Sequence, residues 1–390
     1  MQRLGVVRPG GRRARQRAVV TAFCGAVFLA ACGSSSTSSA GGGGAASSKA
    51  CVSTTGSGPG PWGWPGDSTQ GYLAPNMPDV DCDGSVTIGL LSPGDTHDRG
   101  FYESFVDEAD TFAQQNGWKV ITVDKINPAD AVTQARNLCR QHVDMVAVGA
   151  SELKDAIPVS QEEVCRGTVW YVAGGQGVNQ TPYFVQSQDD ANESGYASGY
   201  AAGLLMKAAG VKKAGFVTGP QLDFAVTFAK AWYAGIKAVV ADATIVVTYT
   251  GSFDDSAKGV EAVKAQLSQG IGLVYPYLGG ATDAVAAEAN KSNISVLTPG
   301  TNRCGGGTPS YAISVIFSPG DYFAAALAPF KAGTLRVGTA RVWHMGKDPV
   351  PSVKICNPTG NEQSQVDSVI QQIGAGTIKP DDLAKATTLP

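Results

Sequence analysis

The sequence predicts an α/β protein of two doubly wound lobes, each a parallel sheet with helices on both faces. Three observations predict this fold. Short, nearly continuous apolar runs such as 86–91 and 169–172 are typical of strands that are buried on both faces. These runs alternate with helical patterns, as in βαβ units. The alternation restarts after Gln188, so we expect two successive α/β halves with a cleft between them.

The first half is expected to contain four strands and three helices. A loop at 92–99 leads into the first helix, which has apolar residues at the helical spacing of Phe101, Phe105 and Phe112. The expected strands are 86–91, 119–123, 144–148 and 169–172, and the other two helices are 129–141 and 151–165.

The second half is expected to alternate helices at 192–209, 223–240, 256–269 and 282–291 with strands at 213–217, 244–249, 271–275 and 294–297. Gly195, Gly199 and Gly203 recur every four residues in its first helix. Polar residues such as Glu193 interrupt this pattern, so we interpret it as a soluble helix whose backbone lies close to a sheet. Open α/β sheets bind ligands beyond the carboxyl ends of their strands. The candidate ligand loops are therefore 92–99, 150–153, 218–224, 276–282 and 299–304.

The first 31 residues have the three parts of a bacterial secretory signal. Six arginines without any acid precede an apolar stretch of 14 residues, 18–31. This stretch is shorter than the roughly 20 residues that a membrane-spanning helix needs. Leu29-Ala30-Ala31-Cys32 resembles a lipobox, so we expect cleavage before Cys32 and a lipidated cysteine whose thiol carries a diacylglyceryl group, with palmitate among the acyl chains. The expected location is the extracytoplasmic face of the cell membrane, held through this lipid anchor.

Charge and composition exclude some classes of function. Removal of the signal changes the net charge from −3 to −9, and an acidic protein is a poor candidate for binding nucleic acid. No cofactor is expected. Asp95, His97 and Asp98 cluster in the first strand-to-helix loop, as an acid–base or metal site requires. No second group of titratable residues accompanies them, so we expect no enzyme.

Six cysteines remain in the mature chain, an even number that favours disulfides outside the cytoplasm. Fifteen pairings are open, and pairing of neighbours along the chain is the simplest. No Cys-x-x-Cys occurs and the three histidines are scattered, so no metal site is expected. The expected pairs are Cys51–Cys82, Cys139–Cys165 and Cys304–Cys356.

Two segments precede the α/β region. Residues 33–50 are mostly Gly, Ser and Ala, and a flexible tether is expected there. Residues 51–84 are rich in Gly and Pro and show no periodicity, so an irregular segment closed by a disulfide is expected. Its Trp62 and Trp64 are either ligand contacts or, as we favour, anchors to the core.

Three stretches resemble the basic membrane lipoprotein family, which contains substrate-binding lipoproteins of ABC transporters, including purine nucleoside receptors. Asp98–Tyr102 is similar to an Asp-Lys-x-Phe-Asn element of the family, and Glu193–Ala202 to its E-x-x-Y-x-A-G-x-x-A helix. Gly251–Gly259 is similar to its G-S-x-x-D-P-x-K-G turn. The resemblance implies a type I periplasmic-binding fold, with two lobes that close on a ligand about a hinge.

The resemblance also implies how a ligand is held. In nucleoside-binding members, aromatic side chains sandwich the base, while acidic and lysine side chains hold the base and the ribose. This sequence departs from that pattern at three places. Tyr102 replaces an asparagine, the segment around Asn302 lacks two acids, and Phe317 stands where the family has a lysine. Ordinary nucleoside binding is therefore less expected than the scaffold itself.

We therefore expect a lipid-anchored, monomeric solute-binding protein that delivers a small planar or polar molecule to the permease of an ABC importer. The alternative is a surface sensor or interaction protein of the same fold. The expected contacts are Asp98, Phe101, Tyr102, Asp223, Phe224, Tyr277, Asn302 and Phe317. The expected organisation is a signal peptide at 1–31, a lipidated tether at 32–50, the irregular segment at 51–84, lobe 1 at 85–188 with part of 299–330, and lobe 2 at 189–298 with part of 331–390.

Overall fold

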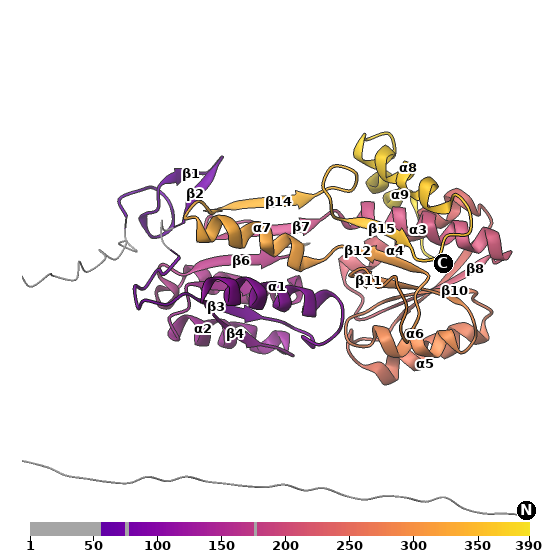
Figure 1. Ribbon diagram of the computed structural model, residues 1–390, viewed down its shortest axis with the longest axis horizontal. Coiled ribbons are helices and arrows are strands. Elements are labelled where there is room, and N and C mark those ends of the chain that lie inside the picture. Colours follow the sequence, from indigo (N-terminus) through magenta and orange to yellow (C-terminus); the bar gives the residue numbers. More distant parts are fainter. Residues whose placement is uncertain (1–55, 75–77, 175–177) are drawn as a thin grey trace, which may run out of the picture. The chain divides into compact units, whose positions relative to one another are not determined.

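The computed structural model describes residues 56–74, 78–174 and 178–390, which belong to one compact unit, Lys49–Pro390. Two six-stranded sheets form its framework (Figure 1). We call each sheet with its covering helices a lobe. The lipidation site Cys32, the tether and Cys51 lie outside the described residues.

The first sheet is parallel throughout, with strand order β14-β7-β6-β5-β3-β4. Its buried strands are apolar on both faces, as the sequence predicts. In chain order the strands are β3 (Thr87–Leu91), β4 (Lys119–Val123), β5 (Met145–Val148), β6 (Val169–Ala173), β7 (Phe184–Asp189) and β14 (Thr339–Trp343).

Helices cover both faces of the first sheet. On one face α1 (Phe101–Asn116) and α7 (Pro319–Lys331) share a core with the sheet; α7 is drawn in orange beside α1 in Figure 1. On the other face lie α2 (Ala131–Arg140), which follows the short 3-10 turn η2 (Pro128–Asp130), and the 3-10 helices η3 (Ser151–Gln161) and η4 (Glu163–Cys165). The predicted helix at 151–165 is thus made of 3-10 segments, and Pro158 lies inside η3, where an α-helix would need its missing N–H.

The second sheet has strand order β15-β12-β11-β10-β8-β9 and is parallel except for its edge strand β15. In chain order its strands are β8 (Lys213–Thr218), β9 (Thr244–Tyr249), β10 (Leu273–Tyr277), β11 (Ser295–Gly300), β12 (Ile313–Ile316) and β15 (Ser352–Ile355). One face is covered by α3 (Ala191–Ala209), α4 (Asp223–Val239), α8 (Glu362–Gly374) and α9 (Pro380–Ala386), and the other by α5 (Ser256–Ser268) and α6 (Thr282–Asn290).

The glycines of α3 lie against a helix, which corrects our interpretation that they approach a sheet. A Cβ atom at Gly199 would lie 2.0 Å from the carbonyl oxygen of Trp232 in α4. Gly235 of α4 faces α3 in the same way, because its Cβ would lie 2.1 Å from the carbonyl oxygen of Tyr196. The small residues let the two helix backbones approach more closely than side chains would allow.

The C-terminal part of the chain serves both lobes. Strand β12 belongs to the second sheet, α7 packs on the first, β14 extends the first sheet, and β15 with α8 and α9 returns to the second. The chain therefore crosses between the lobes three times: from β7 to α3, from β12 to α7, and from β14 to β15. Several crossovers of this kind are what a hinge between two lobes is built from.

The segment before β3 is partly regular. It contains η1 (Pro61–Gly63), β1 (Gly66–Asp67) and β2 (Gly71–Leu73), and β2 pairs with β13 (Arg336–Val337) in a small antiparallel sheet. Trp64 is buried in the core of the first lobe, and Trp62 packs against that core, so both tryptophans anchor the segment as we favoured. The sequence pattern does not predict these strands, because each has only two or three residues and shows no alternation.

Two predicted disulfides are present, Cys139–Cys165 and Cys304–Cys356. Each lies within one lobe: the first joins α2 to η4, and the second joins the loop after β11 to the end of β15. Cys82 is also disulfide-bonded, while its predicted partner Cys51 lies outside the described residues.

Candidate ligand-binding site

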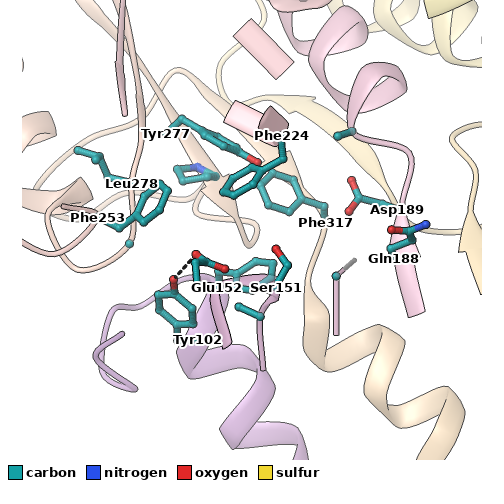
Figure 2. A pocket seen from close by; sticks show the side chains of 16 residues that line it. Tyr102, Ser151, Glu152, Gln188, Asp189, Phe224, Phe253, Tyr277, Leu278 and Phe317 are labelled. Atoms are coloured by element: carbon teal, nitrogen blue, oxygen red, sulfur yellow. Dashed lines mark hydrogen bonds between the residues drawn. The ribbon is translucent and has the colours of Figure 1, made fainter. Parts of the chain in front are cut away.

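A pocket lies where the carboxyl ends of the strands of both sheets meet, and its free volume is about 120 Å³. Figure 2 shows its side chains, and the lining residues come from the ends of strands and from the loops and helix starts that follow them, for β3, β5, β6, β7, β8, β9, β10, β11 and β12. This is the position at which open α/β sheets bind ligands. The lining residues are Phe101, Tyr102, Ala150, Ser151, Glu152, Gly174, Gln188, Asp189, Ala191, Phe224, Phe253, Tyr277, Leu278, Gly279, Pro299 and Phe317.

Aromatic rings dominate the side of the pocket that the second lobe forms. Tyr277, at the end of β10, stacks on Phe228 with ring centroids 4.5 Å apart and meets Phe224 edge-on at 6.3 Å. Phe224 in turn stacks on Phe253 at 6.0 Å. Rings held by neighbouring rings have few rotamers left, so they are prepared to stack on a planar ligand with little loss of side-chain entropy.

Polar groups come mainly from the first lobe. The Tyr102 hydroxyl donates a hydrogen bond to Glu152 Oε1 at 3.3 Å, and both face the aromatic rings in Figure 2. Asp189, the last residue of β7, accepts a hydrogen bond from the Ser194 hydroxyl at 3.1 Å. Burial raises the pKa of Glu152 above its usual range and raises the pKa of Asp189 to about 6.

No lysine, arginine or histidine is among the lining residues that the structure describes. The nearby cations are paired with other acids. Lys125 binds Asp95 at 3.0 Å, and Arg303 makes a bidentate ion pair with Asp283. Among the residues that the structure describes, neither carboxylate of the pocket is paired with a positively charged side chain.

The two lobes touch at the edge of the pocket. The Arg99 guanidinium lies 3.6 Å from Asp283 Oδ2, and the Thr301 hydroxyl donates to the Arg99 carbonyl oxygen at 3.2 Å. Phe101 of the first lobe meets Phe317 of the second with ring centroids 6.2 Å apart. These contacts involve side chains and loops, which a hinge motion can separate without breaking either sheet.

Five of the eight predicted contacts line the pocket, namely Phe101, Tyr102, Phe224, Tyr277 and Phe317. Asp98 does not line it: its buried carboxylate accepts hydrogen bonds from the backbone N–H groups of Gly100, Tyr102 and Glu103 and so caps α1. Asp223 is exposed at the start of α4, and Asn302 accepts a hydrogen bond from the Cys304 backbone; neither lines the pocket.

Several lining residues were missed by reasoning from the sequence. Glu152 lies in the loop 150–153, which was singled out as ligand-facing, so its carboxylate was within reach of prediction. Asp189 ends a strand that was not predicted, because the sequence Gln186-Ser187-Gln188 is polar. Phe253 lies inside the turn that carries the family resemblance, where no contact was expected.

Comparison with known proteins identifies the family. The sequence model described as ABC transporter substrate-binding protein PnrA-like, or Bmp, matches residues 85–373. The chain belongs to this family. Its members are solute-binding proteins, and the family that the sequence resemblance suggested is thereby confirmed.

Two curated proteins are similar to parts of this sequence. The ABC transporter nucleoside-binding protein BmpA of Lactococcus lactis is 39% identical over 104 residues, which are 27% of this chain and 29% of that protein. The CD4+ T-cell-stimulating antigen of Listeria monocytogenes is 26% identical over 209 residues, 52% of this chain and 57% of that protein. The chain thus spans less than two thirds of the length of these curated relatives.

Among solved structures, an ABC transporter solute-binding protein from Conexibacter woesei superimposes with a TM-score of 0.58. The match covers 76% of this chain and 98% of that one at 22% identity. At this identity the likeness shows the fold, which is the predicted two-lobed periplasmic-binding fold. Among the described helices, none has both the length and the apolar character that a membrane crossing requires.

Proposed function

We propose that the mature protein is a lipid-anchored, extracytoplasmic receptor that captures a small planar solute and delivers it to the permease of an ABC importer. The observation that carries the proposal is the pocket at the carboxyl ends of both sheets, with most of its aromatic rings on the side of the second lobe and both carboxylates on the side of the first. A ligand that touches both lobes favours the closed arrangement by the difference in its affinity for the two states. Closure then gives a permease a surface by which to recognise the loaded receptor.

The lining of the pocket supports a particular chemistry for the solute. Stacked rings favour a planar heterocycle, and the relative from Lactococcus lactis is described as nucleoside-binding. Glu152 and Asp189 favour hydrogen-bond donors or a positive charge on that heterocycle, because no lining residue that the structure describes is cationic. Phe317 lies in the pocket at the place where the family pattern has a lysine, which argues against an anionic solute.

A thermal-shift screen followed by calorimetry tests the proposed function. The panel contains nucleosides, free bases, sugars and amino acids, together with three pyridines that differ in charge: cationic N-methylnicotinamide, neutral nicotinamide and anionic nicotinate. We expect stabilisation by a planar compound with donors or a positive charge, and none by nicotinate. Failure of every small solute to raise the melting temperature would contradict the receptor function. A preference for anions would contradict only the chemistry assigned to the pocket.

The lipid anchor is tested separately. Two acyl chains on Cys32 would hold the protein at a membrane, since each buried methylene contributes about 0.8 kcal/mol. We expect Cys32→Ala to release the protein from the membrane fraction while its ligand affinity stays unchanged. Cys32→Ser is the matched variant and should behave in the same way. Full retention of both variants in washed membranes would mean that something other than the cysteine holds the protein there.

A further inference from the structure

The loop before β3 has the sequence Asp79-Val80-Asp81-Cys82-Asp83-Gly84. In calcium-binding loops, oxygen ligands stand at positions one, three and five, and a glycine at position six makes the sharp turn. Asp79, Asp81, Asp83 and Gly84 fill these four positions. Such a loop also needs a carboxylate at position twelve, but that position is Leu90, which is buried within β3. A carboxylate from elsewhere would have to complete it.

Asp144 supplies that carboxylate. It directly precedes β5, which pairs with β3, and this register brings it against the loop. Carboxylate oxygens of Asp79, Asp81 and Asp144 lie within 4.8 Å of one another. The two oxygens of Asp144 accept hydrogen bonds from Val80 N and Thr87 N, both at 2.7 Å, so backbone groups on either side of the loop fix its orientation.

These carboxylates are buried or crowded and have no cationic partner. The Asp144 residue is only 1% exposed. Asp79 turns Oδ2 toward Gly84 N, at 3.0 Å, while its other oxygen, Oδ1, is buried without a hydrogen-bond donor. Within the described part of the chain, no lysine, arginine or histidine forms an ion pair with Asp79, Asp81 or Asp144. Like charges this close, one of them fully buried, are costly without a cation to neutralise them.

We propose that Asp79, Asp81 and Asp144 bind a calcium ion. Oxygen ligands alone select a hard cation, and a loop that offers several carboxylates suits calcium, which takes six to eight oxygens, better than magnesium, which keeps most of its water. Asp190, Glu193 and His344 also cluster, but a histidine ligand suits a transition metal instead. Affinities of extracellular calcium modules, about 10⁻⁴–10⁻³ M, set the scale expected here.

The position of this site defines its role. Asp144 and Thr87 stand at the amino ends of β5 and β3, whereas the ligand pocket lies at the carboxyl ends of the strands. The ion would fasten the segment before β3 to the first lobe, together with the buried Trp64. It would therefore stabilise the lobe without touching the solute.

The test uses the full mature chain after removal of divalent ions with EGTA. We expect 2 mM CaCl₂ to raise the melting temperature by about 2–5 °C and MgCl₂ to have little effect. Equilibrium dialysis should count one bound calcium ion per chain. Absence of binding in dialysis, or an equal response to calcium and magnesium, would overturn the proposal.

Variants locate the ion. Asp81→Asn removes one exposed ligand charge and should weaken calcium affinity by at least about tenfold. Asp130→Asn is the matched control, because Asp130 is an exposed aspartate elsewhere in the same lobe, and it should stay within about twofold of the unaltered protein. Unweakened calcium binding by Asp81→Asn would overturn the assignment. Folding of both variants is checked by circular dichroism in EGTA, where the ion contributes to neither.

Discussion

The two walls of the pocket differ in chemistry. The wall from the first lobe carries both carboxylates, Glu152 and Asp189, the polar side chains of Ser151 and Gln188, and the rings of Phe101 and Tyr102. The wall from the second lobe carries Phe224, Phe253, Tyr277, Leu278 and Phe317 and no charged side chain. The second wall is therefore suited to stacking on the ligand, and the first to selecting ligands that carry a positive charge or hydrogen-bond donors.

This division suggests an order of events. Stacking on the second lobe needs only the rings that Tyr277 and Phe224 already hold in place. Contact with Glu152 and Asp189 requires the first lobe to close on the ligand. The aromatic wall would then set most of the affinity, and the acidic wall would decide which planar solutes drive closure.

Removal of the central ring should have the largest effect. We expect Tyr277→Ala to weaken binding of the best compound from the screen by about 100-fold and to lower the free energy of unfolding by about 3 kcal/mol. The ring stacks on Phe228 at 4.5 Å and also faces the pocket, so both losses follow from one change. Calorimetry and urea denaturation measure them. Tyr277→Phe keeps the ring and should stay within about threefold; undiminished affinity of the alanine variant would refute the stacking wall.

Neutralising the acidic wall should have a smaller and more selective effect. We expect Asp189→Asn and Glu152→Gln each to weaken a cationic planar solute by about tenfold and its neutral analogue by less than about threefold. Competition calorimetry with N-methylnicotinamide and nicotinamide measures the difference. Asp223→Asn is the matched control, because Asp223 is exposed and does not line the pocket. An equal loss of affinity for both solutes would show that the carboxylates do not select the solute by its charge.

The acidic wall should also make binding depend on pH. Burial raises the pKa of Asp189 to about 6, and the charges of Asp190 and Glu193 act in the same direction. Above that pH the carboxylate is ionised and attracts a cation; below it the carboxylate is protonated and the attraction is lost. Affinity for a cationic solute should therefore fall by about tenfold between pH 7.5 and pH 5.

The change with pH should be absent from the neutral solute and reduced in Asp189→Asn. Glu152, whose pKa is also raised by burial, would account for the part that remains. A titration at five pH values by calorimetry is sufficient. A profile that is the same for the cationic and the neutral solute would locate the titrating group outside the pocket.

The smallest effect on binding is expected at Asp98, which the sequence placed in the site and the structure places at the start of α1. We expect Asp98→Ala to lower the free energy of unfolding by about 1–2 kcal/mol and to change affinity by less than about threefold, because three backbone N–H groups lose their acceptor. Asp98→Asn should recover part of the stability. A loss of affinity above tenfold with unchanged stability would return Asp98 to the site.

The two successive α/β halves up to residue 297 were within reach of the sequence because hydrophobic periodicity marks most of their strands and helices. Strand β7 was missed because its second half, which borders the pocket, is polar. The short strands β1 and β2 and the helices and strands after β11 were not predicted from this pattern either. The aromatic contacts were within reach because Phe101, Tyr102 and Phe224 follow predicted strand ends. Tyr277 was found although its strand runs two residues further than expected.

What the sequence could not supply was the distinction between acids that face a ligand and acids that hold the backbone. Asp98 and Glu152 both follow strands of the first sheet, yet one caps a helix and the other lines the pocket. The expectation of no metal site rested on cysteine and histidine spacing. The proposed calcium site uses carboxylates, and its decisive member, Asp144, lies 65 residues from Asp79 and joins it only through the pairing of β3 with β5.

Strands β14 and β15 complete the two sheets from the last part of the chain. A protein that leaves the cell amino end first would therefore export nearly all of its length before either sheet received its final strand. Neither lobe would mature ahead of the other, and a nascent chain stalled before residue 339 would leave β7 and β12 without their last partners. On the export proposed above, assembly of both sheets would wait until the last part of the chain has crossed the membrane.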